Sequence, residues 1–235
     1  MGMFPEDARI PVSKLISLWI AEGFVKNIGS RRLIEEEAEG DSVDVITECP
    51  NLQELNISLA SNGDSSEICL KLESLTQLQI LRLGFRWCII QLGLHLPSNL
   101  KKLVLLDIPI ESAISSIAGL LCLEYLQLRY QFLPQSGEWC LGDITFHQLK
   151  VLKLVNLGIS RLHASEESFP LLETLVIKSA RAFEEVPLSF AYITTLKQIK
   201  LTGYLKESLE ASAVRITEEA ESIEGWDRLK LITVE

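Results

Sequence analysis

The chain of 235 residues is 47% hydrophobic, so it can bury a sizeable core, and global disorder is excluded. Its 22 lysines and arginines stand against 32 aspartates and glutamates, and the net charge of −10 argues against a generic nucleic-acid or anionic-membrane binder. The five cysteines form no CxxC pair and the three histidines stand apart, which predicts reduced core thiols and no metal site.

The start of the sequence predicts where the protein resides. It shows no basic stretch followed by an apolar one, so no secretory signal is expected. No apolar run approaches the roughly 18 residues that a membrane helix needs, so no integral membrane segment is expected either. Together with the unpaired cysteines, these features predict a cytoplasmic protein.

The first forty residues predict a helical segment. Apolar residues recur there at spacings of three and four, at Val12, Leu15, Ile16, Trp19 and Ile20. Pro11 suits the first turn of this helix and Gly23 suits its C-terminal cap. A short extended run at Phe24-Val25 and a second, charged helical stretch around Leu33 to Glu39 are expected to follow.

The same residues resemble a specific family. The runs FPED at 4–7, IP at 10–11, KLISLWIAEGF at 14–24 and RRLIEEEAEG at 31–40 are similar to the winged-helix part of the NB-ARC module in coiled-coil-type plant disease-resistance receptors, most of all the late-blight-resistance group. The resemblance implies an intracellular receptor in plant defence and the hypersensitive response. Its partner would be a protein: a pathogen effector, a guarded host protein or the receptor's own NB-ARC domain.

Two motifs of that family are missing from this sequence. The family binds ADP or ATP, but there is no G-x-x-x-x-G-K-[ST] phosphate loop to supply the backbone cradle and the lysine. After Gly40 the sequence passes directly to Asp41-Ser42-Val43, without the Met-His-Asp nucleotide sensor. We therefore expect no cofactor. Residues 1–40 are interpreted as a partial winged-helix segment of an NB-ARC module and residues 41–51 as a junction. The chain is interpreted as a truncated, internally deleted or partially predicted receptor.

From Leu52 onward the pattern L-x-x-L-x-L recurs at nearly constant spacing. Its first, fourth and sixth positions are Leu52, Leu55, Ile57; Leu78, Leu81, Leu83; Leu100, Leu103, Leu105; Leu123, Leu126, Leu128; Leu149, Leu152, Leu154; Leu172, Leu175, Ile177; and Leu196, Ile199, Leu201. Successive first positions lie 26, 22, 23, 26, 23 and 24 residues apart. An eighth, degenerate copy is expected at Trp226, Leu229 and Leu231.

This spacing predicts an α/β fold. The fourth and sixth positions are two residues apart, so both side chains point to one side of an extended strand. One repeat cannot bury that side alone, so repeats stack, their strands pair in parallel and the leucines form a continuous column. Residues 52–235 are therefore expected to form a leucine-rich-repeat solenoid, a curved parallel sheet with irregular helices and loops on its convex side.

Two details refine that expectation. Repeats of this type often carry asparagine three residues after the sixth position, but here those sites hold Ala60, Arg86, Ile108, Gln131, Leu157, Ala180 and Tyr204. The missing asparagine ladder predicts an irregular solenoid, by analogy with cytosolic plant receptors. The last return, from about Tyr204 to Gly225, is predicted to be a solvated acidic helix that closes the C-terminal end.

The exposed strand positions are expected to form a concave binding face. At positions two, three, five and seven, the seven clear repeats carry nine cations against three glutamates, a local charge of nine minus three, or +6. The predicted partner-binding residues are these cations and one tyrosine: Arg82, Lys101, Lys102, Tyr125, Arg129, Lys150, Lys153, Lys178, Lys197 and Lys200. They favour an acidic protein partner. Alternatively, the lysines only keep exposed strands soluble.

Two other functions are compatible with a repeat solenoid. A leucine-rich-repeat substrate adaptor of a ubiquitin ligase is an alternative, but the N-terminal segment offers fewer helices than an F-box needs. A non-functional receptor fragment is another, because an uncovered apolar edge at the first repeat would favour aggregation. No nucleophile elbow, paired carboxylate motif or metal cluster is visible, so an enzyme is not expected.

Overall fold

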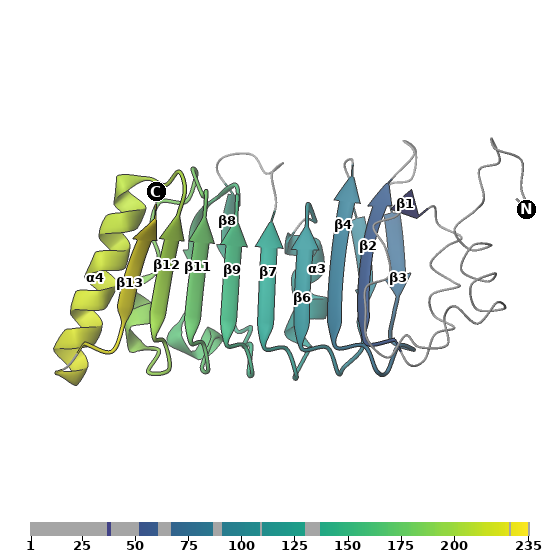
Figure 1. Cartoon of the computed structure of the whole chain (residues 1–235), viewed down its shortest axis with the longest axis horizontal. Helices are drawn as coiled ribbons and strands as arrows, with labels where there is room; N and C mark the ends of the chain where they lie inside the picture. The colour runs from purple at the N-terminus through teal and green to yellow at the C-terminus, as the bar shows by residue number, and fades with distance from the viewer. Residues whose placement is uncertain are drawn as a thin grey trace, which may run out of the picture.

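The computed structural model describes residues 37–38, 52–60, 67–86, 91–108, 110–129, 137–225 and 227–234. In these residues the repeats form a parallel β-solenoid whose strands stand side by side in one nine-stranded sheet (Figure 1). The strands of this sheet, in their spatial order, are β1 (Glu37–Ala38), β2 (Glu54–Ala60), β4 (Ile80–Arg86), β6 (Lys102–Leu106), β7 (Tyr125–Arg129), β9 (Val151–Val155), β11 (Thr174–Lys178), β12 (Gln198–Thr202) and β13 (Lys230–Val234). The predicted leucine-rich-repeat solenoid is confirmed.

The return segments lie behind this sheet and vary from repeat to repeat. They contain β3 (Glu67–Lys71), β5 (Gln91–His95), α3 (Ile110–Ala118), β8 (Gly137–Cys140), β10 (Ile159–His163), η1 (Glu166–Ser168), η2 (Leu188–Tyr192) and α4 (Glu207–Glu224). β3 pairs with β5 and β8 pairs with β10, each pair in parallel. The irregular back that the sequence predicts is therefore present as a mixture of strands, 3₁₀ turns and helices.

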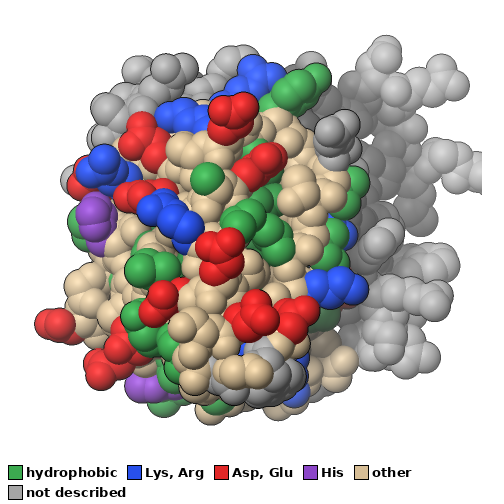
Figure 2. All heavy atoms as spheres, turned by 90° about the vertical axis from the view of Figure 1, so that its left-hand side faces the viewer, with side chains coloured by type: hydrophobic (Ala, Val, Ile, Leu, Met, Phe, Trp, Pro, Cys, Tyr) green, Lys and Arg blue, Asp and Glu red, His purple; other side chains and the backbone are tan. Residues whose placement is uncertain are grey.

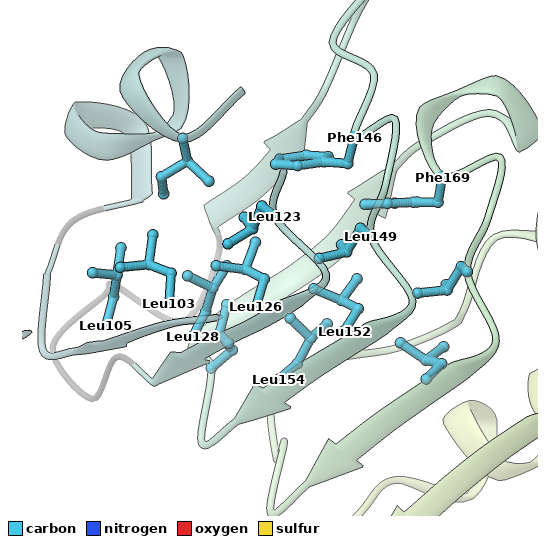
Figure 3. Close-up of a cluster of buried hydrophobic side chains, with 14 of the residues drawn as sticks. Leu103, Leu105, Leu123, Leu126, Leu128, Phe146, Leu149, Leu152, Leu154 and Phe169 are labelled. Atoms are coloured by element: carbon cyan, nitrogen blue, oxygen red, sulfur yellow. The ribbon is translucent and has the colours of Figure 1, made fainter. Parts of the chain in front are cut away.

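The leucine column is built as the spacing predicts. The fourth position of each repeat pairs with the fourth position of the next, from Leu55–Leu81 to Leu175–Ile199. The leucines at the first, fourth and sixth positions are buried, and Figure 3 shows those of β6, β7 and β9 pointing into one shared interior. Each buried leucine contributes roughly 1.5–3 kcal/mol relative to an exposed one, so the column is the main source of stability.

An aromatic stack closes the back of the core. The ring centroids of Phe146 and Phe169 lie 5.5 Å apart with nearly parallel planes, and those of Phe169 and Phe190 lie 5.8 Å apart. All three side chains are buried, and each comes from a different return segment. Phe146 and Phe169 are visible above the leucines in Figure 3. The stack therefore joins successive repeats on the side opposite the sheet.

A left-handed residue ends several of the strands. Two residues after the sixth position, φ is 59° at Asp107, 50° at Asn156, 52° at Ser179 and 75° at Gly203. Each of these residues donates its N–H to a carbonyl of the next strand, as Asn156 does to Lys178 at 2.8 Å. Aspartate, asparagine, serine and glycine tolerate this conformation better than apolar residues do. In β2 and β4 the same site holds Leu59 and Phe85, and these strands continue through it.

Three of the sites that often carry asparagine in such repeats hold apolar side chains in the core. Ile108, Leu157 and Ala180 are buried directly after the left-handed residues. Tyr204, at the same site of the next repeat, is exposed and lies under the Arg181 guanidinium, 4.9 Å from its ring centroid. Apolar packing therefore replaces side-chain hydrogen bonding at the turn of several repeats.

The C-terminal return is a helix, as predicted. α4 buries Leu209, Ala213, Ile216 and Ala220, which recur at helical spacing, and it ends at Gly225 with φ of 75°. Ser212 is also buried, where it accepts a hydrogen bond from the Val186 N–H at 2.9 Å. Figure 2 looks at this end of the molecule and shows many acidic side chains on its surface.

The eighth repeat is present, but its register differs from the predicted one. Leu231, not Leu229, pairs with the fourth-position Ile199, which places Arg228 at the first position. The Arg228 guanidinium donates from Nη1 to the Ile193 carbonyl and from Nη2 to the Ala191 carbonyl, both at 2.6 Å. Arg228, bonded to the end of η2, thus occupies the first position, which leucine holds in the other repeats. The leucine pattern therefore predicted the wrong register for this repeat.

Two further expectations need correction. Glu37–Ala38, within the predicted charged helix, is a strand that pairs with Ser58 and Leu59 of β2. Cys122 and Cys140 are exposed rather than core thiols. The remaining expectations for residues 1–36, 39–51, 88 and 131, and for the side chain of Cys69, lie outside what the structure describes.

Candidate partner-binding face

One side of the nine-stranded sheet faces away from the leucine core. Residues at the third, fifth and seventh repeat positions alternate with the buried ones and therefore point to this side, here called the open face. The parallel register aligns them in rows across the strands. The fifth-position row reads Asn56, Arg82, Val104, Gln127, Lys153, Val176, Lys200 and Ile232.

The structure divides the ten predicted residues into two groups. Seven lie on the open face: Arg82, Lys153 and Lys200 in the fifth-position row, Lys102 and Tyr125 in the third-position row, and Arg129 and Lys178 in the seventh-position row. The other three, Lys101, Lys150 and Lys197, immediately precede β6, β9 and β12.

The second group belongs to a row of alternating charges at the strand starts, here called the charge ladder. It reads Lys101, Glu124, Lys150, Glu173 and Lys197 from repeat to repeat. Lys150 Nζ lies 2.9 Å from Glu124 Oε2, and Lys197 Nζ lies 2.8 Å from Glu173 Oε2. The ladder carries three positive and two negative charges, or +1. The third, fifth and seventh positions of the seven clear repeats carry six cations against Glu54, or +5, and Lys230 adds another cation in the third-position row of β13.

The ion pairs of the charge ladder shift the pKa values of its members. The hydrogen bond and charge of Lys150 hold the pKa of Glu124 below its usual range, and Lys101 adds to the effect. The pKa of Lys150 is raised, first by its bond to Glu124 and then by the charges of Glu124 and Glu173. The bond from Lys197 likewise lowers the pKa of Glu173. Lys150 and Lys197 are therefore engaged with neighbouring repeats, which makes them weaker candidates for contact with a partner.

Tyr125 lies near the middle of the open face. Lys102 of the preceding strand sits over its ring, with Nζ 4.8 Å from the centroid, and its hydroxyl donates to Gln127 Oε1 at 3.1 Å. Partial burial raises the pKa of the tyrosine, while the charge of Arg82 opposes that rise. The ring is fixed by both contacts, so a partner would meet a preorganised aromatic surface.

The fifth-position cations are spaced along a line. Arg82 and Lys153 are three strand spacings apart, roughly 14 Å, and Lys153 and Lys200 are two apart, roughly 10 Å. These separations exceed the Debye length of about 8 Å at physiological salt, so the cations repel one another little. Within 4 Å, no carboxylate of the described residues pairs with any of the three.

The prediction from charge overlooked the apolar part of this face. Val104 and Val176 separate the cations in the fifth-position row, and Val151 and Val155 flank Lys153 along β9. Their valine side chains suit strand positions; Val151, Val155 and Val176 are only partly buried, whereas Val104 is buried. The open face therefore offers aliphatic surface between positive charges. The alternation of valine with lysine in VLKLV was the available sequence signal.

The back of the molecule holds a hollow of about 450 Å³ lined by charged residues of β10, α4 and the loops between them. Its charges pair internally. Arg161 Nε and Lys206 Nζ lie 3.6 Å and 3.2 Å from the Glu184 carboxylate, and Arg215 lies 3.8 Å from Glu185. This pairing joins α4 to the solenoid and leaves the hollow a weaker candidate site than the open face.

The fold and this surface define a leucine-rich-repeat solenoid with a basic, partly aliphatic open face. Comparison with known proteins adds the family. Residues 3–43 match the winged helix domain of disease resistance proteins. The chain is 33% identical over 113 residues to a putative late blight resistance protein homolog of Solanum demissum, and the match covers 48% of this chain and 9% of that protein. It is 32% identical over 139 residues to late blight resistance protein R1-A of the same species, a match that covers 58% and 11%.

These matches confirm the resemblance noted in the first forty residues. The chain is similar to plant NB-ARC and leucine-rich-repeat disease-resistance proteins of the late-blight-resistance group. The matched stretch spans about a tenth of each relative's length. Among the helices of the described ranges, none has both the length and the hydrophobicity needed to cross a membrane.

Proposed function

We propose that this chain is the protein-recognition part of a plant intracellular immune receptor, acting in the cytoplasm in defence against pathogens. It binds a protein partner through the open face and performs no catalysis. The observation that carries the proposal is the row formed by Arg82, Lys153 and Lys200, which the parallel register aligns on one rigid sheet. Similarity to the late blight resistance proteins supports the defence role.

The partner surface that fits this row is acidic with apolar patches between its charges. The chain as a whole carries −10, so the basic open face is a local reversal that orients a partner. Opposed potentials raise the rate of encounter and fix orientation more than they add affinity. Valines between the cations and the ring of Tyr125 supply the buried apolar contact that affinity requires.

The partner is a pathogen effector, a guarded host protein or the NB-ARC domain of a receptor of this kind. The match of residues 3–43 supports the receptor over a ubiquitin-ligase adaptor, because the matched winged helix domain is one of disease resistance proteins. No nucleotide cofactor is assigned to residues 1–235, where neither the phosphate-loop pattern nor Met-His-Asp occurs.

Charge reversal of the fifth-position row tests the proposal. The triple variant Arg82→Glu, Lys153→Glu and Lys200→Glu is compared with wild type for binding to the NB-ARC part of late blight resistance protein R1-A. Affinity is measured by biolayer interferometry at several salt concentrations. We expect a loss of about tenfold or more and a flatter salt dependence, because both arise from the removed charges.

A matched control changes the net charge by the same amount on other surfaces. It reverses three exposed cations that lie off the open face: Lys71, Arg181 and Arg215. This control is expected to bind within about twofold of wild type, since surface charges distant from a contact contribute little. Equal losses in both triple variants, or no binding by wild type at low salt, would contradict the proposal.

A further inference from the structure

Three side chains with metal-binding atoms meet on the back of the solenoid. β8 and β10 are parallel neighbours, and their register places His163 opposite Cys140. Glu138 and Cys140 are two residues apart on β8, so they share one side of the strand, while Trp139 between them is buried on the other. The Glu138, Cys140 and His163 side chains are all exposed, on the same face of this small sheet.

The distances bring the ligand atoms close to one another. His163 Nε2 lies 3.1 Å from Glu138 Oε2, and one donor atom of each residue lies within 4.8 Å of the other two. In a tetrahedral zinc site the bond lengths are about 2.0–2.3 Å, so donor atoms lie roughly 3.3–3.8 Å apart. Closing the remaining gap of about 1 Å needs only side-chain rotation, because all three groups face solvent.

We propose that Glu138, Cys140 and His163 form a zinc-binding site with three protein ligands. The set of one sulfur, one imidazole nitrogen and one carboxylate oxygen suits Zn²⁺, whereas Mg²⁺ and Ca²⁺ require oxygen ligands. The ligands come from strands that the solenoid register holds in place, with Ser160 Oγ donating to the Gly137 carbonyl at 3.2 Å beside them. The fourth position faces solvent and takes a water or a side chain of a partner.

Bound zinc would fasten two successive return segments together. Glu138 and Cys140 belong to the return that follows β7, and His163 belongs to the one that follows β9. The metal replaces the single imidazole–carboxylate contact with three bonds, and the cysteine binds as the thiolate, so binding releases a proton. The expected consequence is a metal-dependent rise in the melting temperature of the whole chain.

Cobalt titration tests the site, because Co²⁺ takes the same ligands and a thiolate–cobalt bond gives a charge-transfer absorption. The full chain, reduced and metal-free, is titrated with Co²⁺ and then with Zn²⁺. We expect one equivalent of Co²⁺ to saturate the charge-transfer band and Zn²⁺ to displace it. Cys140→Ser is expected to abolish the band, and His163→Gln and Glu138→Gln to weaken Co²⁺ binding about tenfold or more, or at least 1.4 kcal/mol.

The chain offers matched controls in an exposed cysteine and an exposed histidine outside the cluster. Cys122→Ser and His147→Gln are expected to bind Co²⁺ as wild type does. Circular dichroism of the metal-free variants checks that each one folds, and Glu138→Gln alters the site without changing side-chain size. A band that survives in Cys140→Ser, is lost in Cys122→Ser, or never saturates at one equivalent would overturn the proposal.

Discussion

Lys150, immediately before β9, donates to the Glu124 carboxylate immediately before β7, with 2.9 Å between Nζ and Oε2. The two residues are 26 positions apart in sequence but occupy the same site in successive repeats. The Lys150 N–H also donates to the Glu124 carbonyl at 2.9 Å. A backbone bond and a side-chain bond thus join the same two residues, so the charge ladder has the same repeat-to-repeat register as the strands.

Replacing Lys150 with methionine should raise the pKa of Glu124 toward its ordinary value, because the bond and charge that lower it are removed. A depressed folded-state pKa stabilises the protein above the unfolded pKa of about 4.3, and this contribution disappears as the pH falls through the folded value. The variant should therefore lose less stability than wild type on acidification below about pH 4. NMR titration of the Glu124 carboxyl carbon measures the shift, and an unchanged pKa would contradict the assignment.

The turn after β12 should not tolerate a side chain at position 203. Gly203 has φ of 75°, and a Cβ there would lie 2.6 Å from Ser179 Oγ. Gly203→Ala should cost about 1–3 kcal/mol, from the left-handed strain and the contact together. Ser179→Gly should be neutral or stabilising, since Ser179 itself has φ of 52°. Urea unfolding of both single variants and the double variant separates the two causes, because only the contact is relieved in the double variant.

Removing the middle ring of the aromatic stack should destabilise the core. Phe169 is fully buried between Phe146 and Phe190, and Phe169→Ala leaves a cavity that costs about 3–5 kcal/mol in the free energy of unfolding. Leu171→Ala, at a neighbouring exposed site, is the control and should cost less than about 1 kcal/mol. Similar urea midpoints for the two variants would show that the stack does not support the fold.

The final strand should depend on Arg228. Arg228→Ala removes two charge-assisted bonds to the Ile193 and Ala191 carbonyls, so β13 loses its attachment to the end of η2. Hydrogen exchange of the β13 amides should accelerate about tenfold or more while β12, which retains β11 as a partner, stays protected. Uniform acceleration of both strands, or of neither, would contradict this role.

The sequence was sufficient for the repeating core and insufficient for its variations. Leucine spacing predicts the strands, their parallel pairing and the buried column. Side chains on a strand alternate between its two faces, so only one register buries all of the leucines. The register of β13 was not predictable from leucines, since Arg228 fills the first position through hydrogen bonds to backbone carbonyls. The left-handed turns at Asp107, Asn156 and Ser179 were not predictable either. Aspartate, asparagine and serine favour a positive φ but do not require it.

The candidate sites, like the fold, could be predicted only in part from the sequence. Counting charges at strand positions located the cations of the open face but did not separate Lys153 from Lys150, which is bonded to a glutamate of the preceding repeat. The spacing of possible metal ligands along one helix could not predict the cluster of Glu138, Cys140 and His163. His163 lies 25 residues beyond Glu138 and reaches it only through the pairing of β10 with β8.

Lysine footprinting tests most directly whether the open face meets the partner. The chain is acetylated alone and in complex with the NB-ARC part of late blight resistance protein R1-A, and modification is quantified by mass spectrometry. Lys153, Lys178 and Lys200 should become protected in the complex, while Lys71 and Lys206 on the back should react equally in both states. Protection of the back lysines with unchanged reactivity on the open face would contradict the account.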